Sequence, residues 1–147
     1  MKYTTSILID QPRSKVIELF DSTENMYKWQ PELLSFEHIS GEPGQDGAKS
    51  KMRYKMGKRE IDMIETITKQ NFPDEFDCTY EANKVWNLQQ NTFREINSIQ
   101  TQWISISIFK CSGFMKIMCW LMPGAFKKQT LKSMIRFKEF AENAKDA

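Results

Sequence analysis

The sequence contains a single histidine, three cysteines and no long apolar run, and each scarcity excludes a class of function. No CxxC pair occurs, and His38 alone cannot supply the several nitrogen and sulfur ligands that a zinc site needs. We therefore expect no metal and no cofactor. The longest apolar run, residues 113–123, carries Lys116 and is too short to cross a bilayer. A net charge of +2, with basic and acidic residues interleaved, predicts no nucleic-acid partner.

The cysteines Cys78, Cys111 and Cys119 are an odd number without the spacing of metal ligands. We interpret them as buried, reduced thiols that behave as small hydrophobic side chains. The first ten residues are polar and strand-like, so we expect no signal peptide and a cytoplasmic protein. The length fits one domain, and no linker or repeat divides residues 1–147.

The stretch from residue 123 to residue 147 predicts one long amphipathic helix, because Pro123 and Gly124 can begin it and neither residue type follows. Its apolar residues spread over roughly 220° of a helical wheel, which is wider than a stripe that packs on one side only. The arc contains Phe126, Thr130, Leu131, Met134, Ile135, Phe137, Phe140, Ala141 and Ala144. Lys127 and Lys138 lie inside it, where their stems can be buried and their ammonium groups can reach water or an anionic part of a ligand.

The residues before this helix predict a strand at 3–10, two short helices at 12–20 and 21–29, and then about six strands. These strands are expected at 36–41, 48–56, 60–69, 75–82, 85–96 and 101–110. The alternation breaks between Leu88 and Phe93, which suggests a β-bulge. Hairpin-length turns make the sheet antiparallel, and one of its faces needs a cover. We therefore predict an α+β helix-grip fold, a strongly twisted antiparallel sheet wrapped around the long C-terminal helix.

Several segments resemble the SRPBCC superfamily, also called START-like or polyketide cyclase-like proteins, whose fold is the helix grip. They are Pro12 and Phe20 around the first helix, Trp29-Gln30-Pro31 after the second, the turns at 40–47 and at Pro73, and Thr101-Gln102-Trp103. Residues 122–130, followed by Phe137-Lys138 and Glu142, look like the small bacterial single-domain members. The resemblance implies a hydrophobic cavity between sheet and helix. Members bind lipids, sterols or polyketides, some act as cyclases or dehydratases, and some modulate chaperone ATPases.

An aromatic and methionine-rich pocket is the first candidate site. Ser105 and Ser107 alternate with Trp103 and Phe109 on one face of a strand, and these small polar groups leave space that a filled core would occupy. An ordinary core is the alternative. The candidate ligand-binding residues are Met63, Tyr80, Trp86, Phe93, Trp103, Ser105, Ser107, Phe109, Phe126, Leu131, Met134, Phe137 and Lys138.

The nearly continuous apolar segment 113–122 is the second candidate. It can form a buried helical turn under the long helix. The alternatives are a mobile lid over the cavity or a surface that touches a membrane or a partner.

Catalytic chemistry has less support, because no nucleophile lies beside a histidine base and no glycine-rich phosphate loop occurs. Glu65 shares the parity of the apolar residues of its strand, and burial would raise the pKa of its carboxyl. Tyr80 could then donate a proton. A Glu65 that faces solvent or pairs with a cation is the alternative.

The sequence therefore favours a protein that binds or transports a small hydrophobic, lipid- or polyketide-like ligand, rather than an enzyme. One alternative is a polyketide cyclase or dehydratase that uses Glu65 and Tyr80. Another is a protein-interaction module or homodimer that uses Ile104, Ile106 and Ile108 or residues 118–122.

Overall fold

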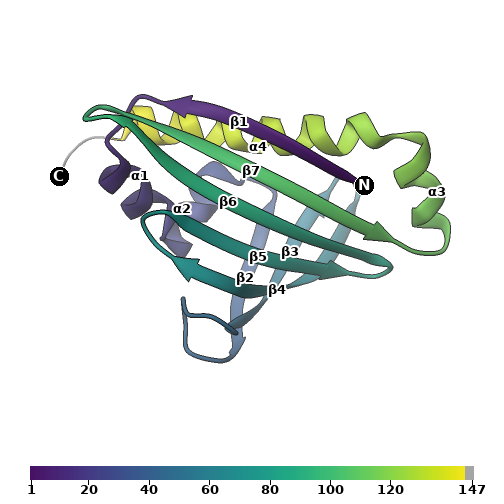
Figure 1. The fold of residues 1–147 in the computed structure, drawn as a ribbon. Helices are drawn as coiled ribbons and strands as arrows, with labels where there is room; N and C mark the ends of the chain where they lie inside the picture. Colours follow the sequence, from purple (N-terminus) through teal and green to yellow (C-terminus); the bar gives the residue numbers. More distant parts are fainter. Residues whose placement is uncertain (145–147) are drawn as a thin grey trace.

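The computed structural model describes residues 1–144, and within them seven antiparallel strands form one sheet in the order β1-β7-β6-β5-β4-β3-β2. A 21-residue helix, α4 (Pro123–Asn143), runs alongside β1 at one side of the curved sheet (Figure 1). This arrangement confirms the predicted α+β helix-grip fold. Residues 145–147 of the expected helix lie outside the described residues.

The strands follow one another along the chain as hairpins from β2 onward, while β1 pairs with the last strand. They are β1 (Lys2–Ile9), β2 (Leu33–Ser40), β3 (Lys49–Met56), β4 (Arg59–Asn71), β5 (Glu75–Ala82), β6 (Val85–Asn97) and β7 (Gln100–Cys111). Each strand that the sequence predicts is present, with its ends shifted by a few residues. The strand pairings were predictable because short turns separate segments in which apolar and polar residues alternate.

The bulge expected between Leu88 and Phe93 is wrong. β6 pairs with β7 without interruption over residues 85–95, and its irregularity follows that range. The apolar alternation is interrupted in the sequence because polar side chains occupy inward positions on the parity of the buried Phe93. These inward side chains are Asn87, Gln89 and Asn91.

Two short helices close one end of the sheet and a third lies at the other end (Figure 1). They are α1 (Arg13–Phe20), α2 (Thr23–Trp29) and α3 (Phe114–Leu121). The Ser22 side chain accepts a hydrogen bond from the Asn25 N–H at 3.1 Å, which satisfies a free donor in the first turn of α2. Arg136 on α4 and Glu32 pair at 2.6 Å and hold the long helix near α2.

The filled core lies at the end of the sheet near α1 and α2, with the Phe20 ring at its centre. Six other rings lie 5.0–6.4 Å from it, five of them edge-on, an arrangement that aromatic quadrupoles favour. They belong to Trp29, Phe72, Phe76, Phe93, Trp103 and Phe137. Helix α4 contributes Phe137 and Ala141, which are fully buried.

The apolar arc predicted for α4 is too wide at one edge only, where Ile135 is 40% exposed. Met134, Phe137 and Ala141 are buried, and the other residues of the arc, Phe126, Thr130, Leu131, Phe140 and Ala144, are half-buried. Met134, Phe137 and Ala141 follow i, i+3, i+7 spacing, which is the stripe of a helix packed on one side of a sheet.

The expectation of three reduced thiols is wrong for two of them. Cys111 at the end of β7 and Cys119 in α3 form a disulfide, with their Cα atoms 6.8 Å apart. Cys78 is buried and free, as expected. The disulfide therefore ties α3 to the last strand. Among the described residues, we find no helix that has both the length and the apolar character needed to cross a membrane.

Candidate functional site

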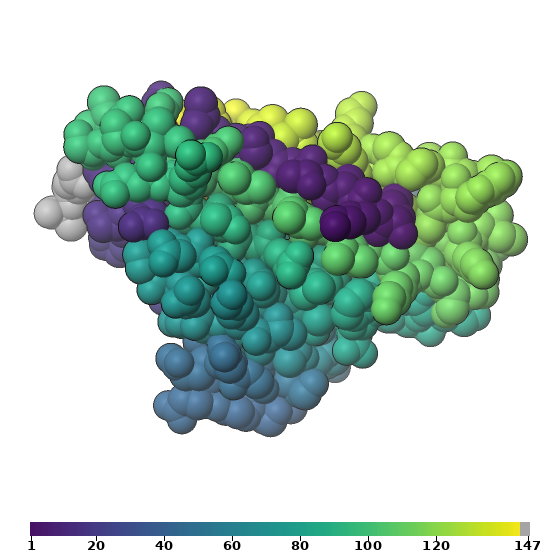
Figure 2. Space-filling model, viewed as in Figure 1, coloured from purple at the N-terminus to yellow at the C-terminus, as the bar shows by residue number. Residues whose placement is uncertain are grey.

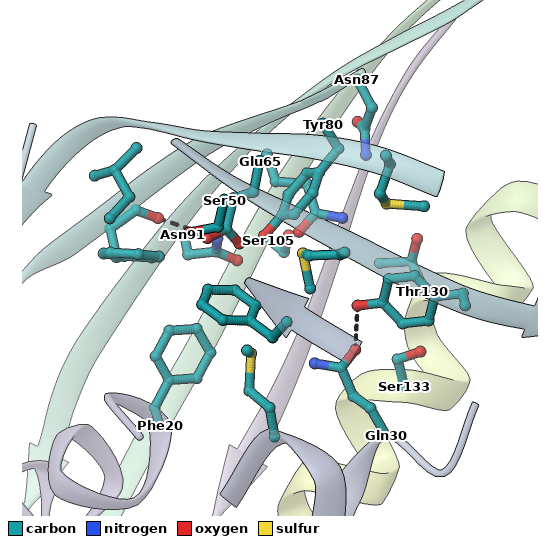
Figure 3. A pocket seen from close by; sticks show the side chains of 18 of the residues that line it. Phe20, Gln30, Ser50, Glu65, Tyr80, Asn87, Asn91, Ser105, Thr130 and Ser133 are labelled. Carbon is teal, nitrogen blue, oxygen red and sulfur yellow. Dashed lines mark hydrogen bonds between the residues drawn. The ribbon is translucent and has the colours of Figure 1, made fainter. Parts of the chain in front are cut away.

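A cavity of about 760 Å³ lies between the sheet and α4, in the space that the aromatic core leaves free. Its walls come from strands β2 to β7, from the turn between β2 and β3, from α1, α2 and α4, and from Met115 of α3. Figure 3 shows side chains that reach it from the sheet and from the long helix. The volume is within the range of natural small-molecule sites, roughly 300–1,000 Å³.

Methionine and aromatic side chains form most of the apolar wall. Met52, Met63 and Met134 enter from β3, β4 and α4, and Phe109 and Phe126 close the side near α3 with ring centroids 5.1 Å apart. Methionine side chains are flexible and polarisable, so they can follow apolar ligands of different shapes.

A row of polar side chains crosses the floor of the cavity from strand to strand. Ser50 on β3 lies opposite Glu65 on β4, Glu65 opposite Tyr80 on β5, and Tyr80 opposite Asn87 on β6. All four line the cavity (Figure 3). Directly opposite residues share one face of a sheet, so antiparallel pairing alone assembles this row.

Glu65 is the buried acid of this row, with an exposed fraction of 8%. Burial raises the pKa of its carboxyl, and a hydrogen bond with Tyr80 offsets part of that rise. None of the ion pairs found among residues 1–144 involves Glu65. Burial and the nearby Glu65 charge also raise the pKa of Tyr80 well above its usual value. The pair therefore favours the protonated forms of both groups.

Two buried polar atoms in the cavity wall have no hydrogen-bond partner among the described residues. They are the indole Nε1 of Trp29, a donor, and the amide Oδ1 of Asn87, an acceptor. Asn91 is different, because its Oδ1 accepts from Trp103 at 2.9 Å and its Nδ2 donates to the Phe76 carbonyl at 3.0 Å. Asn91 thus holds the framework, whereas Trp29 Nε1 and Asn87 Oδ1 are buried without a partner.

Seven of the predicted ligand-binding residues line the cavity. They are Met63, Tyr80, Trp103, Ser105, Phe109, Phe126 and Met134. Phe93 and Phe137 belong to the aromatic core instead, and Ser107 is fully buried with an unpaired hydroxyl outside the cavity wall. The inward face predicted for Trp103, Ser105 and Phe109 is therefore the face that encloses the cavity.

Three further predicted residues lie away from the cavity. Trp86 is on the outer face of β6, because it is adjacent in sequence to the inward-facing Asn87 and successive side chains of a strand point to opposite faces. The Lys110 ammonium lies 5.0 Å from the centroid of the Trp86 ring. Lys138 pairs with Glu142 one turn along α4. Leu131 is half-buried on α4 outside the cavity wall.

Sequence reasoning missed most of the polar residues that line the cavity, among them Trp29, Ser50 and Asn87. The parity of Phe93 on β6 carried the signal for Asn87, since both occupy odd positions of one regular strand. Trp29 had no such signal, because its burial depends on how α2 packs against the aromatic core.

The interpretation of residues 113–122 as a buried turn is wrong. They form α3, whose Phe114 and Trp120 side chains are 68% and 79% exposed. Met115 is the residue of α3 that lines the cavity.

Solved structures with this fold include enzymes and proteins without a stated activity. A conserved protein from Geobacillus kaustophilus is 17% identical with a TM-score of 0.80, and 96% of this chain covers 95% of that one. The Zhui aromatase/cyclase from Streptomyces sp. R1128 is 8% identical with a TM-score of 0.79, covering 97% and 93%. Norcoclaurine synthase from Thalictrum flavum, solved with dopamine and hydroxybenzaldehyde, is 9% identical with a TM-score of 0.76, covering 100% and 89%.

No family model and no curated protein sequence matches this chain. At identities of 8–17%, the structural likeness concerns the fold and does not assign an activity. The likeness extends over nearly the whole chain and includes the sheet and the long C-terminal helix. The chain therefore has the helix-grip fold of the SRPBCC superfamily, which confirms the predicted resemblance at the level of the fold.

Proposed function

We propose that the protein binds a small, mainly apolar molecule with a polar end in the cavity between the sheet and α4. The observation that carries this proposal is a cavity of about 760 Å³ whose wall is mostly methionine and aromatic, with the polar row of Ser50, Glu65, Tyr80 and Asn87 across its floor. Apolar walls supply affinity by burial, and few convergent polar groups fix orientation.

The chemistry of the wall narrows the ligand class. Aromatic and methionine side chains suit a ring-containing or lipid-like body. Burial raises the pKa of Glu65, and the protonated form of its carboxyl can donate a hydrogen bond to a carbonyl or hydroxyl oxygen. Two proteins of this fold support a ring-containing ligand: one is described as an aromatase/cyclase, and another was solved with dopamine and hydroxybenzaldehyde.

Filling the cavity should weaken binding. Ser105 lines the cavity from β7, so Ser105→Leu places an apolar side chain in the ligand's space. We expect it to weaken binding of 1-anilinonaphthalene-8-sulfonate about tenfold or more, since displaced contacts worth about 1.4 kcal/mol change affinity tenfold. Fluorescence titration measures this. Native mass spectrometry of the freshly purified protein would identify a natural ligand.

The matched control is Ser6→Leu, the same change at an exposed position of the neighbouring strand β1. It should bind the probe as the wild type does. Equal binding by Ser105→Leu, in a variant that circular dichroism shows to be folded, would place the probe outside the cavity and reject the proposal.

A second candidate function is acid–base catalysis of the cyclase or dehydratase type. The buried Glu65 beside Tyr80 favours it, because burial raises the pKa of this carboxyl, and a carboxyl with a raised pKa can protonate a substrate oxygen while its conjugate base can accept a proton from carbon. Balanced proton transfer between these groups and a 1,3-dicarbonyl ligand needs no other reactant.

Benzoylacetone tests this candidate, since exchange of its acidic C–H protons in D₂O is followed by nuclear magnetic resonance. We expect the protein to accelerate exchange and Glu65→Gln to reduce that acceleration about 100-fold or more, with probe binding retained. Tyr80→Phe should reduce it less. An unchanged rate in Glu65→Gln would remove Glu65 from the chemistry while leaving the binding proposal intact.

A single START-like domain, a cytoplasmic location and a homodimer stay predictions. The homodimer would use the outward-facing Ile104, Ile106 and Ile108 of β7, which are half-buried.

A further inference from the structure

The end of the molecule at α3 carries an exposed apolar surface that the cavity does not use. We call it the α3 surface; it consists of Phe114, Ile117, Trp120, Leu121 and Met122, each at least 50% exposed. The four residues within the helix gather on one side by helical spacing. Figure 2 shows this yellow-green end projecting away from the sheet.

The other side of α3 is fastened to the body of the protein. Met115 lines the cavity, and Cys119 forms the disulfide with Cys111 of β7. Because the opposite side of α3 is attached to the body, the side chains of the α3 surface point outward and do not pack in the core. Isolated exposed apolar residues are ordinary, but five adjacent ones that include a tryptophan are the mark of an interaction surface.

The charge around this surface is mainly positive. Residues 96–138 contain seven basic residues and no aspartate or glutamate. Lys116 lies on α3, and Lys127 and Lys128 are exposed near the start of α4, the helix that α3 contacts. The Lys84 side chain lies beside Gly113 at the start of α3. Glu81 is an acidic residue close to Lys84 and Cys111 at this end of the molecule.

We propose that the α3 surface docks on lipid bilayers that contain anionic lipids. A short helix with Trp, Phe and Leu on one side and lysines around it lies in the plane of the headgroups, with the tryptophan at the interface. Lysines near such a surface are attracted to its negative potential. The helix has eight residues, so it rests on the bilayer and does not cross it.

A lipid surface fits these observations better than a second copy of the chain. A symmetric dimer through the α3 surface would bring Lys116, Lys127 and Lys128 of two copies together, and like charges oppose such contact. An anionic bilayer instead offers apolar depth and negative charge at the same place. Docking would also set the Met115 end of the cavity at the membrane, although the docking proposal does not depend on cavity binding.

Vesicle co-sedimentation of the whole protein tests the proposal. We expect the protein to sediment with vesicles of phosphatidylcholine and phosphatidylglycerol, less with phosphatidylcholine alone, and less as salt is raised. The double variant Ile117→Ser and Trp120→Ser should lower the partition coefficient about tenfold or more. Lys127→Gln with Lys128→Gln should lower it for the mixed vesicles and leave binding to phosphatidylcholine unchanged.

The control variant is Ile99→Ser, which removes an exposed apolar side chain from the turn between β6 and β7 at the far end of the sheet. It should bind vesicles as the wild type does. Equal binding by the Ile117→Ser and Trp120→Ser variant would overturn the proposal. A lack of vesicle binding would also overturn it, and light scattering that shows a dimer broken by the same variant would assign the α3 surface to self-association.

Discussion

Phe137→Ala should lower the free energy of unfolding by about 3–5 kcal/mol, among the largest effects of any single substitution in this protein. The Phe137 ring is fully buried, and it contacts Phe20, Trp29 and Trp103 at ring-centroid distances of 5.2–5.7 Å. Its loss leaves a hole among rings that cannot move inward, because α4 and the sheet fix their backbones. Urea unfolding followed by circular dichroism measures the change.

Phe126→Ala is the matched control, since it removes the same side chain three turns earlier on the same helix. Phe126 is half-buried and lines the cavity, so truncation enlarges a space that already exists. We expect a loss of about 1 kcal/mol. Equal losses in the two variants would show that the cavity end of the molecule is packed as tightly as the aromatic core, which would contradict the division between core and cavity.

The sheet was predictable because its strands carry a two-residue period between short turns. In β7 the alternation of Trp103, Ser105 and Phe109 with isoleucines separates the two faces of the strand, although parity alone does not decide which of them points inward. In β6 the same rule failed, since inward Asn87 and Gln89 replaced the apolar residues that the rule expects. The failure lies at the cavity, where inward-facing polar groups border open space and not a close-packed core.

Contacts between distant segments were not predictable. Trp29 enters the cavity wall because α2 packs against Phe20 and α4, and no local pattern records that contact. The pairing of Cys111 with Cys119 depends on α3 folding back toward β7, which an odd cysteine count does not indicate. The apolar run before α4 identified a helix but not its exposure, because burial of a short helix is decided by its neighbours.

Glu65→Gln should remove a fall in stability with pH. Burial raises the pKa of Glu65 in the folded state above the value of about 4.3 that a glutamate has in an unfolded chain. Between these two values the folded state holds a proton that the unfolded state has released. Stability of the wild type therefore falls as pH rises through this window, by up to about 1.4 kcal/mol per pH unit, and it levels off above the folded-state pKa.

Glutamine is neutral in both states, so the variant gains on the wild type as pH rises from about 4. Urea unfolding of both proteins across the pH range measures the difference in their free energies of unfolding. Burial also raises the pKa values of Asp21 and Asp77, but both proteins contain these residues, so their contributions cancel in the difference. Asp62→Asn should give the opposite trend with pH. The hydrogen bond from Arg53 lowers the pKa of Asp62 in the folded state, so the stability that the Asp62 carboxylate contributes to the wild type is lost as pH falls. Parallel curves of stability against pH for Glu65→Gln and the wild type would show that the pKa of Glu65 is not raised by folding. The inference of a raised carboxyl pKa on the cavity floor would then be rejected.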